Sequence, residues 1–284
     1  MLSDWRAVLL LRKASTEIPI ADRRWKTPPR NVVEIRPILN RLSEAGELVP
    51  LEGFPSLYRV NAPYARTEAV EEEEVLMELH PYAALSHISG LSFHQMTEQL
   101  SKDIHVSIPD NGSGGLLPLG TRSEDWEGVA LVRGRIADSI FDRRIHWHRL
   151  IGKRIFGTSA YNYHGCMIRV TTPERTLLDG LLQPDWSGGF ANVLGAWAEY
   201  RDLIDLKALV KYVDQLDVRI LRQRAGFLLE ELGIQHPSLA IWVTQAQRGG
   251  SSKLNGGAEF SSQFSERWQL SINAPIDVLR EAQT

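Results

Sequence analysis

The sequence predicts an α+β protein in which an N-terminal winged helix-turn-helix is followed by a larger mixed α/β domain. Residues 1–66 show three helical patterns and then two strand patterns, the element order of a winged helix-turn-helix. Residues 82–94 show a helical pattern that leads into residues 104–108, whose alternation is typical of a half-buried strand. We therefore expect one domain over residues 1–66 and a second over residues 67–284, joined by an acidic helical connector, residues 67–80.

The first two N-terminal elements are short. Asp4 is the residue type that caps a helix, and the apolar positions after it predict a helix over residues 4–14. Residues 18–25 predict a second short element, which the prolines of residues 27–30 bring to an end in a turn. A compact helical pair is therefore expected ahead of the third helix.

The third helix and the hairpin follow directly. Asn31 is expected to cap a helix over residues 32–45, and Pro37 is expected to begin its regular part because proline suits a first helical turn. Gly46 fits the position just after the helix. Two strands, residues 48–51 and 56–60, complete the hairpin, or wing.

Charge is distributed unevenly along the chain. Residues 1–66 hold 11 Lys and Arg against 7 Asp and Glu, whereas residues 67–284 hold 21 against 28. A basic head on an acidic body indicates that only the head would meet a polyanion such as DNA.

The third helix of a winged helix-turn-helix presents its N-terminal residues to base edges in the major groove. Arg and Asn are the side chains that make paired hydrogen bonds to guanine and adenine, and basic residues of the preceding turn hold phosphates. The tip of the wing, residues 52–55, holds an acid and no Lys or Arg, so little minor-groove binding is expected. A winged helix that binds protein instead remains the alternative. The candidate DNA-binding residues are Arg23, Arg24, Lys26, Arg30, Asn31, Arg36 and Arg41.

The second domain alternates strands and helices. Thr172, Pro173 and Glu174 form a capped helix start, and Arg175 and Asp179 are spaced as an i,i+4 ion pair. Basic residues at 143–154 form a second patch, either a nucleic-acid contact or a solvated sheet edge. Strands are expected at residues 129–132, 145–150, 167–171 and 268–273, and helices at 174–181, 190–200, 206–213 and 217–232, the last ended by Gly233.

No catalytic or metal site is expected. His146 and His148 share a strand face but lack a third ligand nearby, and Cys166 next to His164 is more typical of a structural thiol. No known catalytic motif appears, so we expect no enzyme activity and no cofactor, and a metal-dependent nucleic-acid enzyme is the less favoured alternative. One cysteine fits a reducing compartment, and the apolar run at residues 7–11 is too short for a signal peptide, so the protein is expected to be cytoplasmic.

Taken together, these segments resemble the AbiEi family of antitoxins from type IV (abortive-infection) toxin–antitoxin systems. The matching pieces are the N-terminal winged helix, residues 82–109, residues 170–181 and residues 266–275. The resemblance implies a repressor that binds double-stranded DNA at its own promoter, where the symmetry of such sites leads us to expect an inverted repeat. It also implies neutralisation of a nucleotidyltransferase-like toxin, with no stable complex required. The residues to which it points for the antitoxin activity are Tyr82, His94, Glu174, Arg175 and Asp179.

Overall fold

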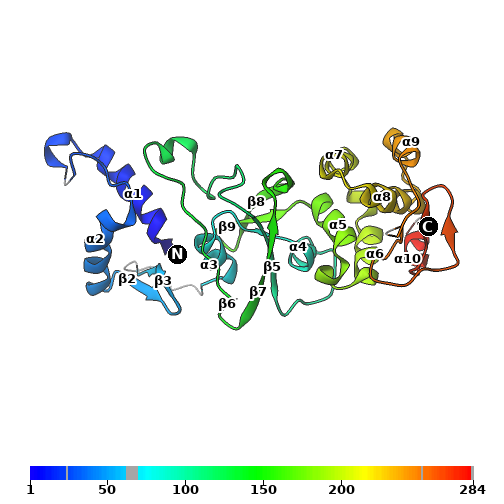
Figure 1. Cartoon of the computed structure of the whole chain (residues 1–284). Helices are drawn as coiled ribbons and strands as arrows, with labels where there is room; N and C mark the ends of the chain where they lie inside the picture. Colours follow the sequence, from blue (N-terminus) through cyan, green and yellow to red (C-terminus); the bar gives the residue numbers. More distant parts are fainter. Residues whose placement is uncertain (24, 62–69, 251, 283–284) are drawn as a thin grey trace. The chain divides into compact units, whose positions relative to one another are not determined.

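The structure is a computed structural model that describes residues 1–23, 25–61, 70–250 and 252–282 (Figure 1). These residues pack as two compact units that interleave along the sequence. Unit 1 comprises residues 1–83, 109–142 and 160–169, and unit 2 comprises residues 84–108, 143–159 and 170–284. The expected boundary between residues 66 and 67 lies outside the described residues.

Helices and a multi-stranded sheet both occur, so the mixed α/β class is confirmed. The largest sheet has six strands in the order β6-β7-β5-β4-β9-β8. In unit 2, the short strand β4 (Ala84–Leu85) pairs antiparallel with β5 (Ile104–Pro109) and parallel with β9 (Cys166–Thr171) through Leu85 and Val170. The sheet is therefore mixed in direction.

The first elements of unit 1 are β1 (Leu2–Ser3), α1 (Asp4–Glu17), a 3₁₀ turn η1 (Ile20–Asp22) and α2 (Val32–Glu44), followed by β2 (Leu48–Leu51) and β3 (Phe54–Val60). The three strands form an antiparallel sheet in the order β1-β3-β2. Apolar side chains from the two helices and from β2 meet in one small core: Ala7, Val8, Ile35, Leu39 and Leu48.

The starts of α1 and α2 each differ from expectation in one respect. Ser3, not Asp4, caps α1: its hydroxyl accepts a hydrogen bond from the Arg6 amide. Asp4 is the first helical residue, a position that favours an acid because of the helix dipole. In α2, Pro37 lies inside a helix that is already regular from Val32, so the expected irregular first turn is absent. The Asn31 cap and Gly46, whose φ is 72°, are confirmed.

The expected acidic connector contributes a packed helix. α3 (Glu72–Leu79) buries every residue from Val75 onward instead of one apolar side only. The buried Glu78 carboxylate accepts hydrogen bonds from the Ser3 hydroxyl and from Arg6 Nε, at 2.6 Å for the latter, and its backbone oxygen accepts from Trp5 Nε1. α3 therefore belongs to unit 1 as part of its core and anchors the start of α1.

Residues 109–142 of unit 1 are mostly irregular. They contain a 3₁₀ turn, η2 (Ser123–Trp126), and the short strand β6 (Ser139–Ile140), and the strand expected at residues 129–132 does not form. The indole of Trp126 stacks on that of Trp5 with ring centroids 6.1 Å apart. The loop is thus held by side chains, with little backbone pairing of its own.

Unit 2 begins with a correction to the stretch predicted as one helix over residues 82–94. Residues 84–85 form β4, and only His87–Phe93 form a helix, α4. The alternation of apolar and polar residues that marks a strand is absent here, because both faces of this short segment are buried. Gly90 lies against the next helix: a Cβ there would be 3.0 Å from the Thr176 side chain.

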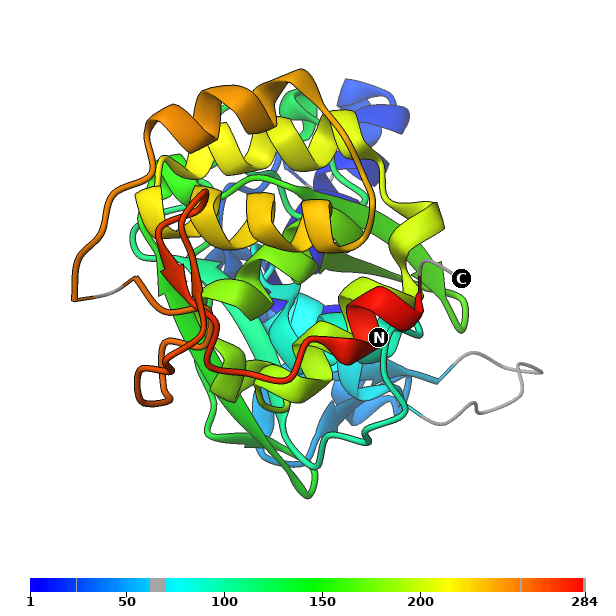
Figure 2. The same cartoon turned by 90° about the vertical axis from the view of Figure 1, so that its right-hand side faces the viewer.

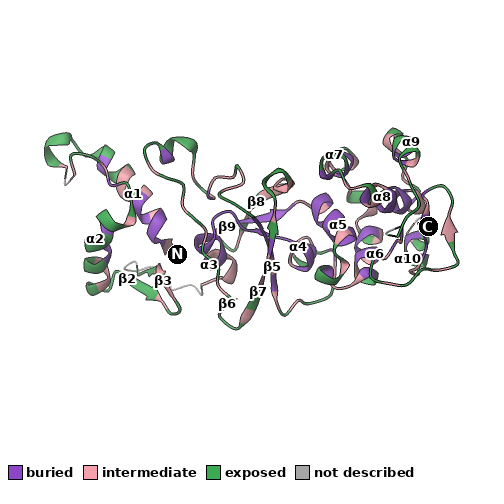
Figure 3. Cartoon of the chain, viewed as in Figure 1, coloured by how far each residue is buried: buried purple, intermediate pink, exposed green. Residues whose placement is uncertain are grey.

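A helical layer completes unit 2. Helix α5 (Pro173–Leu182), capped by the Thr172 hydroxyl as predicted, packs against α4, α6, α7 and α8. Figure 2 shows these helices side by side, and Figure 3 shows that α5 and α8 are largely buried. The other helices of this layer are α6 (Phe190–Glu199), α7 (Leu206–Leu216), α8 (Arg219–Glu231), α9 (Pro237–Thr244) and α10 (Asp277–Glu281).

The remaining strands differ partly from expectation. β7 (Arg143–Leu150) matches its prediction, whereas the strand expected at residues 268–273 shortens to β11 (Leu270–Ser271), paired with β10 (Phe264–Ser265). β8 (Thr158–Tyr163) was not predicted. It turns into β9 through His164 and Gly165, both at positive φ, as a two-residue hairpin turn requires. Within the described chain no helix has the length and apolar character to span a bilayer.

Two helical glycines of unit 2 give a matched test of this packing. A Cβ on Gly226 in α8 would lie 2.1 Å from the ring of Trp268, whose Nε1 donates to Glu230 and fixes the indole. Gly226→Ala should therefore lower the free energy of unfolding by about 1–3 kcal/mol, the usual cost of overpacking, measured by urea denaturation.

Gly195 in α6 is the control, because a Cβ there would meet no atom within 4 Å. Gly195→Ala should leave stability unchanged or raise it by up to about 1 kcal/mol, since alanine favours a helix. Equal effects of the two substitutions would contradict the packing described for α8.

Candidate functional site

The basic residues predicted to meet DNA lie around the start of α2 and along it. Lys26, Arg30, Arg36 and Arg41 are exposed. Arg23 is half-buried because its guanidinium donates to the backbone oxygens of Ile18 and Thr16, at 2.7 and 3.1 Å. Arg24 lies outside the described residues. Four basic side chains are thus available to a polyanion, and Arg23 mainly braces the turn before α2.

Asn31 is committed to the backbone of α2. Its Oδ1 accepts from the Glu34 amide at 3.2 Å, and its Nδ2 donates to Glu34 Oε1 at 2.7 Å. Glu34 Oε2 in turn accepts from the Arg30 amide at 3.1 Å. This reciprocal capping satisfies otherwise unpaired groups at the helix start. Reading an adenine would require the Asn31 amide to leave the cap, whereas the Arg30 side chain is unencumbered.

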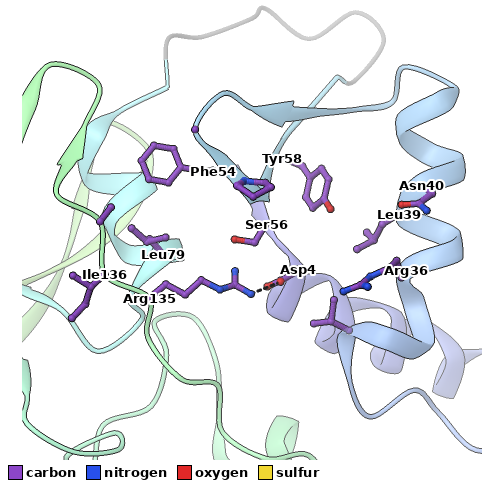
Figure 4. Close-up of a pocket in the computed structure, with 14 residues that line it drawn as sticks. Asp4, Arg36, Leu39, Asn40, Phe54, Ser56, Tyr58, Leu79, Arg135 and Ile136 are labelled. Carbon is purple, nitrogen blue, oxygen red and sulfur yellow. Dashed lines mark hydrogen bonds and ion pairs between the residues drawn. The ribbon is translucent and has the colours of Figure 1, made fainter.

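Arg36 lies on one flank of α2. Helical spacing places it with Val32, Leu39 and Asn40, and Figure 4 shows Arg36 and Leu39 on the side of α2 that faces Asp4 and Tyr58. Within the described chain the Arg36 guanidinium has no hydrogen-bond or ion-pair partner. The outermost face of α2 carries Val33, which is 70% exposed.

A cavity of about 570 Å³ opens beside this flank, entirely within unit 1. Its walls come from α2, from the tip of the hairpin and its second strand β3, and from the segment around Arg135. Arg135 Nη2 donates to Asp4 Oδ2 at 2.7 Å across one side of the cavity (Figure 4). The lining residues are Asp4, Val32, Arg36, Leu39, Asn40, Gly53, Phe54, Pro55, Ser56, Tyr58, Leu79, Arg135, Ile136 and Ala137.

The residues expected for antitoxin activity belong to two different units, and all of them except the half-buried His94 are buried. Tyr82 belongs to unit 1, where its buried hydroxyl donates to the backbone oxygen of Val132 at 2.9 Å, and burial raises its pKa to about 12. The other four, His94, Glu174, Arg175 and Asp179, belong to unit 2. Tyr82 thus acts as a hydrogen-bond donor that holds the irregular segment around Val132.

Three of the four residues in unit 2, Arg175, Glu174 and His94, contact backbone groups at the ends of neighbouring segments, and Asp179 pairs with Arg175. The Arg175 side chain is 2% exposed; Nε donates to Asp179 at 2.9 Å, and Nη1 donates to the backbone oxygens of Arg154 and Phe156. Glu174 accepts from the amide of Asp205 at 3.1 Å. His94 Nε2 lies 2.7 Å from the backbone oxygen of Thr171, and burial lowers its pKa. These contacts are structural, and all of them except that of the half-buried His94 are made by buried side chains.

A cluster of four histidines in unit 2 was not predicted as a unit. His105 lies between His146 and His148, with ring centroids 4.6 and 5.2 Å away, and its Nδ1 is 3.1 Å from His148 Nε2. His87 packs edge-on against His148 at 4.5 Å, and Trp186 stacks on His148 at 4.1 Å. The H-x-H spacing on β7 was visible in the sequence, but the pairing that brings His87 and His105 to it was not.

Burial favours the uncharged form of three histidines of this cluster, His87, His105 and His148. Burial lowers the pKa of His87 to about 3, helped by the charges of His105 and Arg175, and lowers that of His148 to about 3 and that of His105 to about 4. His87 Nδ1 and Asp179 Oδ2 are buried without a hydrogen-bond partner. Burial also raises the pKa of the Asp179 carboxyl, against the opposing effect of Arg175.

The surroundings of Cys166 disfavour its thiolate form. Burial raises the pKa of the Cys166 thiol to about 11, with a further contribution to this rise from the nearby carboxylates of Glu74, Glu73 and Glu71. His164 contacts Glu71 at 3.4 Å instead of activating the thiol. No group of three or more His, Cys, Asp or Glu among these residues is arranged to hold a metal ion.

Comparison with known proteins gives little. No family model matches the sequence, and no curated protein matches it. Among solved structures, the chain is similar to the crystal structure of the RV2827C protein from Mycobacterium tuberculosis, with 13% sequence identity and a TM-score of 0.48. The alignment covers 86% of this chain and 81% of that chain. No residue of this chain takes a role from it.

The histidine cluster predicts a loss of stability in acid. The pKa of His87 is 6.5 in the unfolded chain and about 3 in the folded chain. Between these pH values the unfolded state therefore binds more protons than the folded state. The stability present above pH 6.5 is therefore lost progressively as the pH falls toward 3, by about 2 kcal/mol at about pH 5 for His87 alone. In His87→Asn the free energy of unfolding should fall by about 2 kcal/mol less than in the parent chain between neutral pH and about pH 5. Urea denaturation at each pH measures this difference.

His164→Asn is the matched control. His87 and His164 both have positive φ, 52° and 45°, a conformation that asparagine tolerates, but the His164 side chain is 60% exposed. This variant should keep the pH dependence of the parent chain. An unchanged pH dependence in His87→Asn would show that the cluster accepts protons without cost.

Proposed function

We propose that the protein is a DNA-binding transcriptional regulator whose head, residues 1–61, works as a winged helix-turn-helix. The observation that carries this proposal is the order α1, η1, α2 and the β2–β3 hairpin around one core, with exposed basic side chains at the start of α2. In such a unit α2 would be the recognition helix and the hairpin the wing. The operon of the protein itself is the proposed target.

The proposed DNA contacts divide by position. Lys26 and Arg30 lie at the N-terminal end of α2, where backbone amides and the helix dipole also favour phosphate. Arg30 is the best placed to reach a guanine, because its side chain is exposed while Asn31 is held in the cap. Arg41 is exposed one turn beyond Pro37 and suits a phosphate.

The antitoxin part of the proposal rests on the resemblance to AbiEi antitoxins. On that basis the larger part of the chain would neutralise a nucleotidyltransferase-like toxin without a stable complex. Four of the residues first considered for this activity are buried and His94 is half-buried, so contact with another molecule would use mainly other side chains at the surface. The surface would then be supported from beneath by Tyr82, His94, Glu174, Arg175 and Asp179.

A head that binds protein is the second candidate, and one observation favours it. Val33 on the outward face of α2 is 70% exposed, and Pro37 follows one turn later on the same face. An exposed apolar residue in the first turn of a recognition helix, the end that would meet DNA, suits a protein surface better than phosphates. The two candidates differ in their response to salt, because only DNA binding releases condensed counterions.

The first experiment is fluorescence anisotropy of the full chain on DNA from upstream of its own gene, competed with random DNA over a salt series. Specific binding that weakens linearly in log affinity against log salt is expected. Arg30→Ala should reduce specific binding by about 1–3 kcal/mol and affect random DNA less. Lys26→Ala should weaken both equally and reduce the salt slope by about one.

Lys207→Ala provides the control, because Lys207 is an exposed basic residue of α7 in unit 2. It should leave both affinities unchanged. Absence of any preference for the upstream DNA at every salt concentration would overturn the proposal. Salt-insensitive capture of a protein partner would then establish the second candidate.

A further inference from the structure

We propose that the cavity beside α2 is a binding site for a small organic monoanion, a carboxylate with an aromatic body, and that its occupation weakens DNA binding. The site itself stands on the cavity alone; its effect on DNA rests on the function proposed above. The charge of the cavity, its uncommitted polar groups and its apolar walls each favour such a ligand (Figure 4).

The charge of the lining favours an anion. Arg36, Arg135 and Asp4 are its charged side chains, and Asp4 is neutralised by Arg135 at 2.7 Å. Asp4 Oδ1 is also used, as it accepts from the Trp5 amide. One net positive charge remains, on Arg36. A monoanion therefore matches the cavity, whereas a cation would meet repulsion and a polyphosphate would lack partners.

Two polar groups of the lining are uncommitted. Neither the Arg36 guanidinium nor the Tyr58 hydroxyl has a partner in the part of the chain that the structure describes. Both line the same cavity, in which Figure 4 shows Tyr58 and Arg36 between α2 and the hairpin. A guanidinium offers two parallel N–H donors that match the two oxygens of a carboxylate, and the phenol adds a third donor.

The other walls are largely apolar, and the size fits an aromatic ring. Leu39, Phe54, Leu79 and Ile136 line the space between the polar groups. A volume of about 570 Å³ lies within the range of about 300–1,000 Å³ of small-molecule sites, where apolar walls supply affinity and a few polar groups fix orientation. A bare inorganic anion would leave these apolar walls uncovered.

The position of the cavity links it to DNA. Its walls combine α2 with the hairpin from Gly53 to Tyr58, the two elements that would contact DNA in a winged helix-turn-helix. A carboxylate paired with Arg36 would neutralise one positive charge on the recognition helix. Loss of one positive charge on the DNA-facing helix weakens the electrostatic attraction to all DNA. The bound anion would therefore act as an inducer that releases a repressor.

The test uses 2-naphthoate as the probe, with binding to the full chain measured by calorimetry. Arg36→Gln should raise the dissociation constant at least about tenfold, because it removes a charge-assisted pair. Tyr58→Phe should raise it by roughly threefold to tenfold through loss of one hydrogen bond. The neutral analogue 2-naphthylmethanol and inorganic phosphate should both bind at least about tenfold more weakly.

Arg59→Gln is the matched control, because Arg59 is an exposed arginine of β3 outside the lining. It removes the same charge and should leave naphthoate binding unchanged. Equal losses in Arg36→Gln and Arg59→Gln would overturn the site and leave only non-specific attraction. So would phosphate binding as tightly as naphthoate, or no naphthoate binding at all.

The DNA arm separates the two proposals. Saturating 2-naphthoate should weaken DNA binding by the parent chain several-fold, and the same concentration should have less effect on Tyr58→Phe. Naphthoate bound through Arg36 without any change in specific DNA affinity would overturn the inducer role. Naphthoate bound through Arg36 in a chain with no DNA preference would overturn the regulator function and leave the anion site standing.

Discussion

Unit 1 depends on two carboxylates, Glu78 and Asp4, that its fold buries at the start of α1 and that each need hydrogen-bond donors. A buried carboxylate is stable only when donors surround it. Glu78 receives the Ser3 hydroxyl and Arg6, and Asp4 receives Arg135 and the Trp5 amide. These contacts join segments that are far apart in the sequence. They also form one side of the cavity beside α2, so its shape follows from how these charges are satisfied.

Features set by neighbouring residues were predicted well. The Asn31 cap, Gly46 after α2 and the Thr172 cap with Pro173 each depend on contacts within one helical turn. Where the sequence misled, a distant contact decided the outcome. Ala84 and Leu85 looked helical but form a strand because β5 and β9 supply partners on both sides. No local pattern reports such partners.

The same division applies to the candidate site. Exposure of Lys26, Arg30 and Arg41 follows from their place outside the apolar stripe of the head. Sequence spacing does not specify side-chain geometry. It therefore could not predict that the Asn31 side-chain amide donates to Glu34, or that Arg36 lines a cavity. The histidine cluster was missed because His87 and His105 reach β7 only through the fold of unit 2.

The hydrogen bonds that hold the start of α1 also determine where this protein can be cut for engineering. A cut near residue 66 looks natural in the sequence, yet it would remove the partners of Ser3, Arg6 and Asp4, which lie on α3 and near residue 135. The excised head would expose Trp5 and leave Asp4 without its cation. A cassette exchange should therefore carry all three segments of unit 1, because the head is modular in sequence and not in three dimensions.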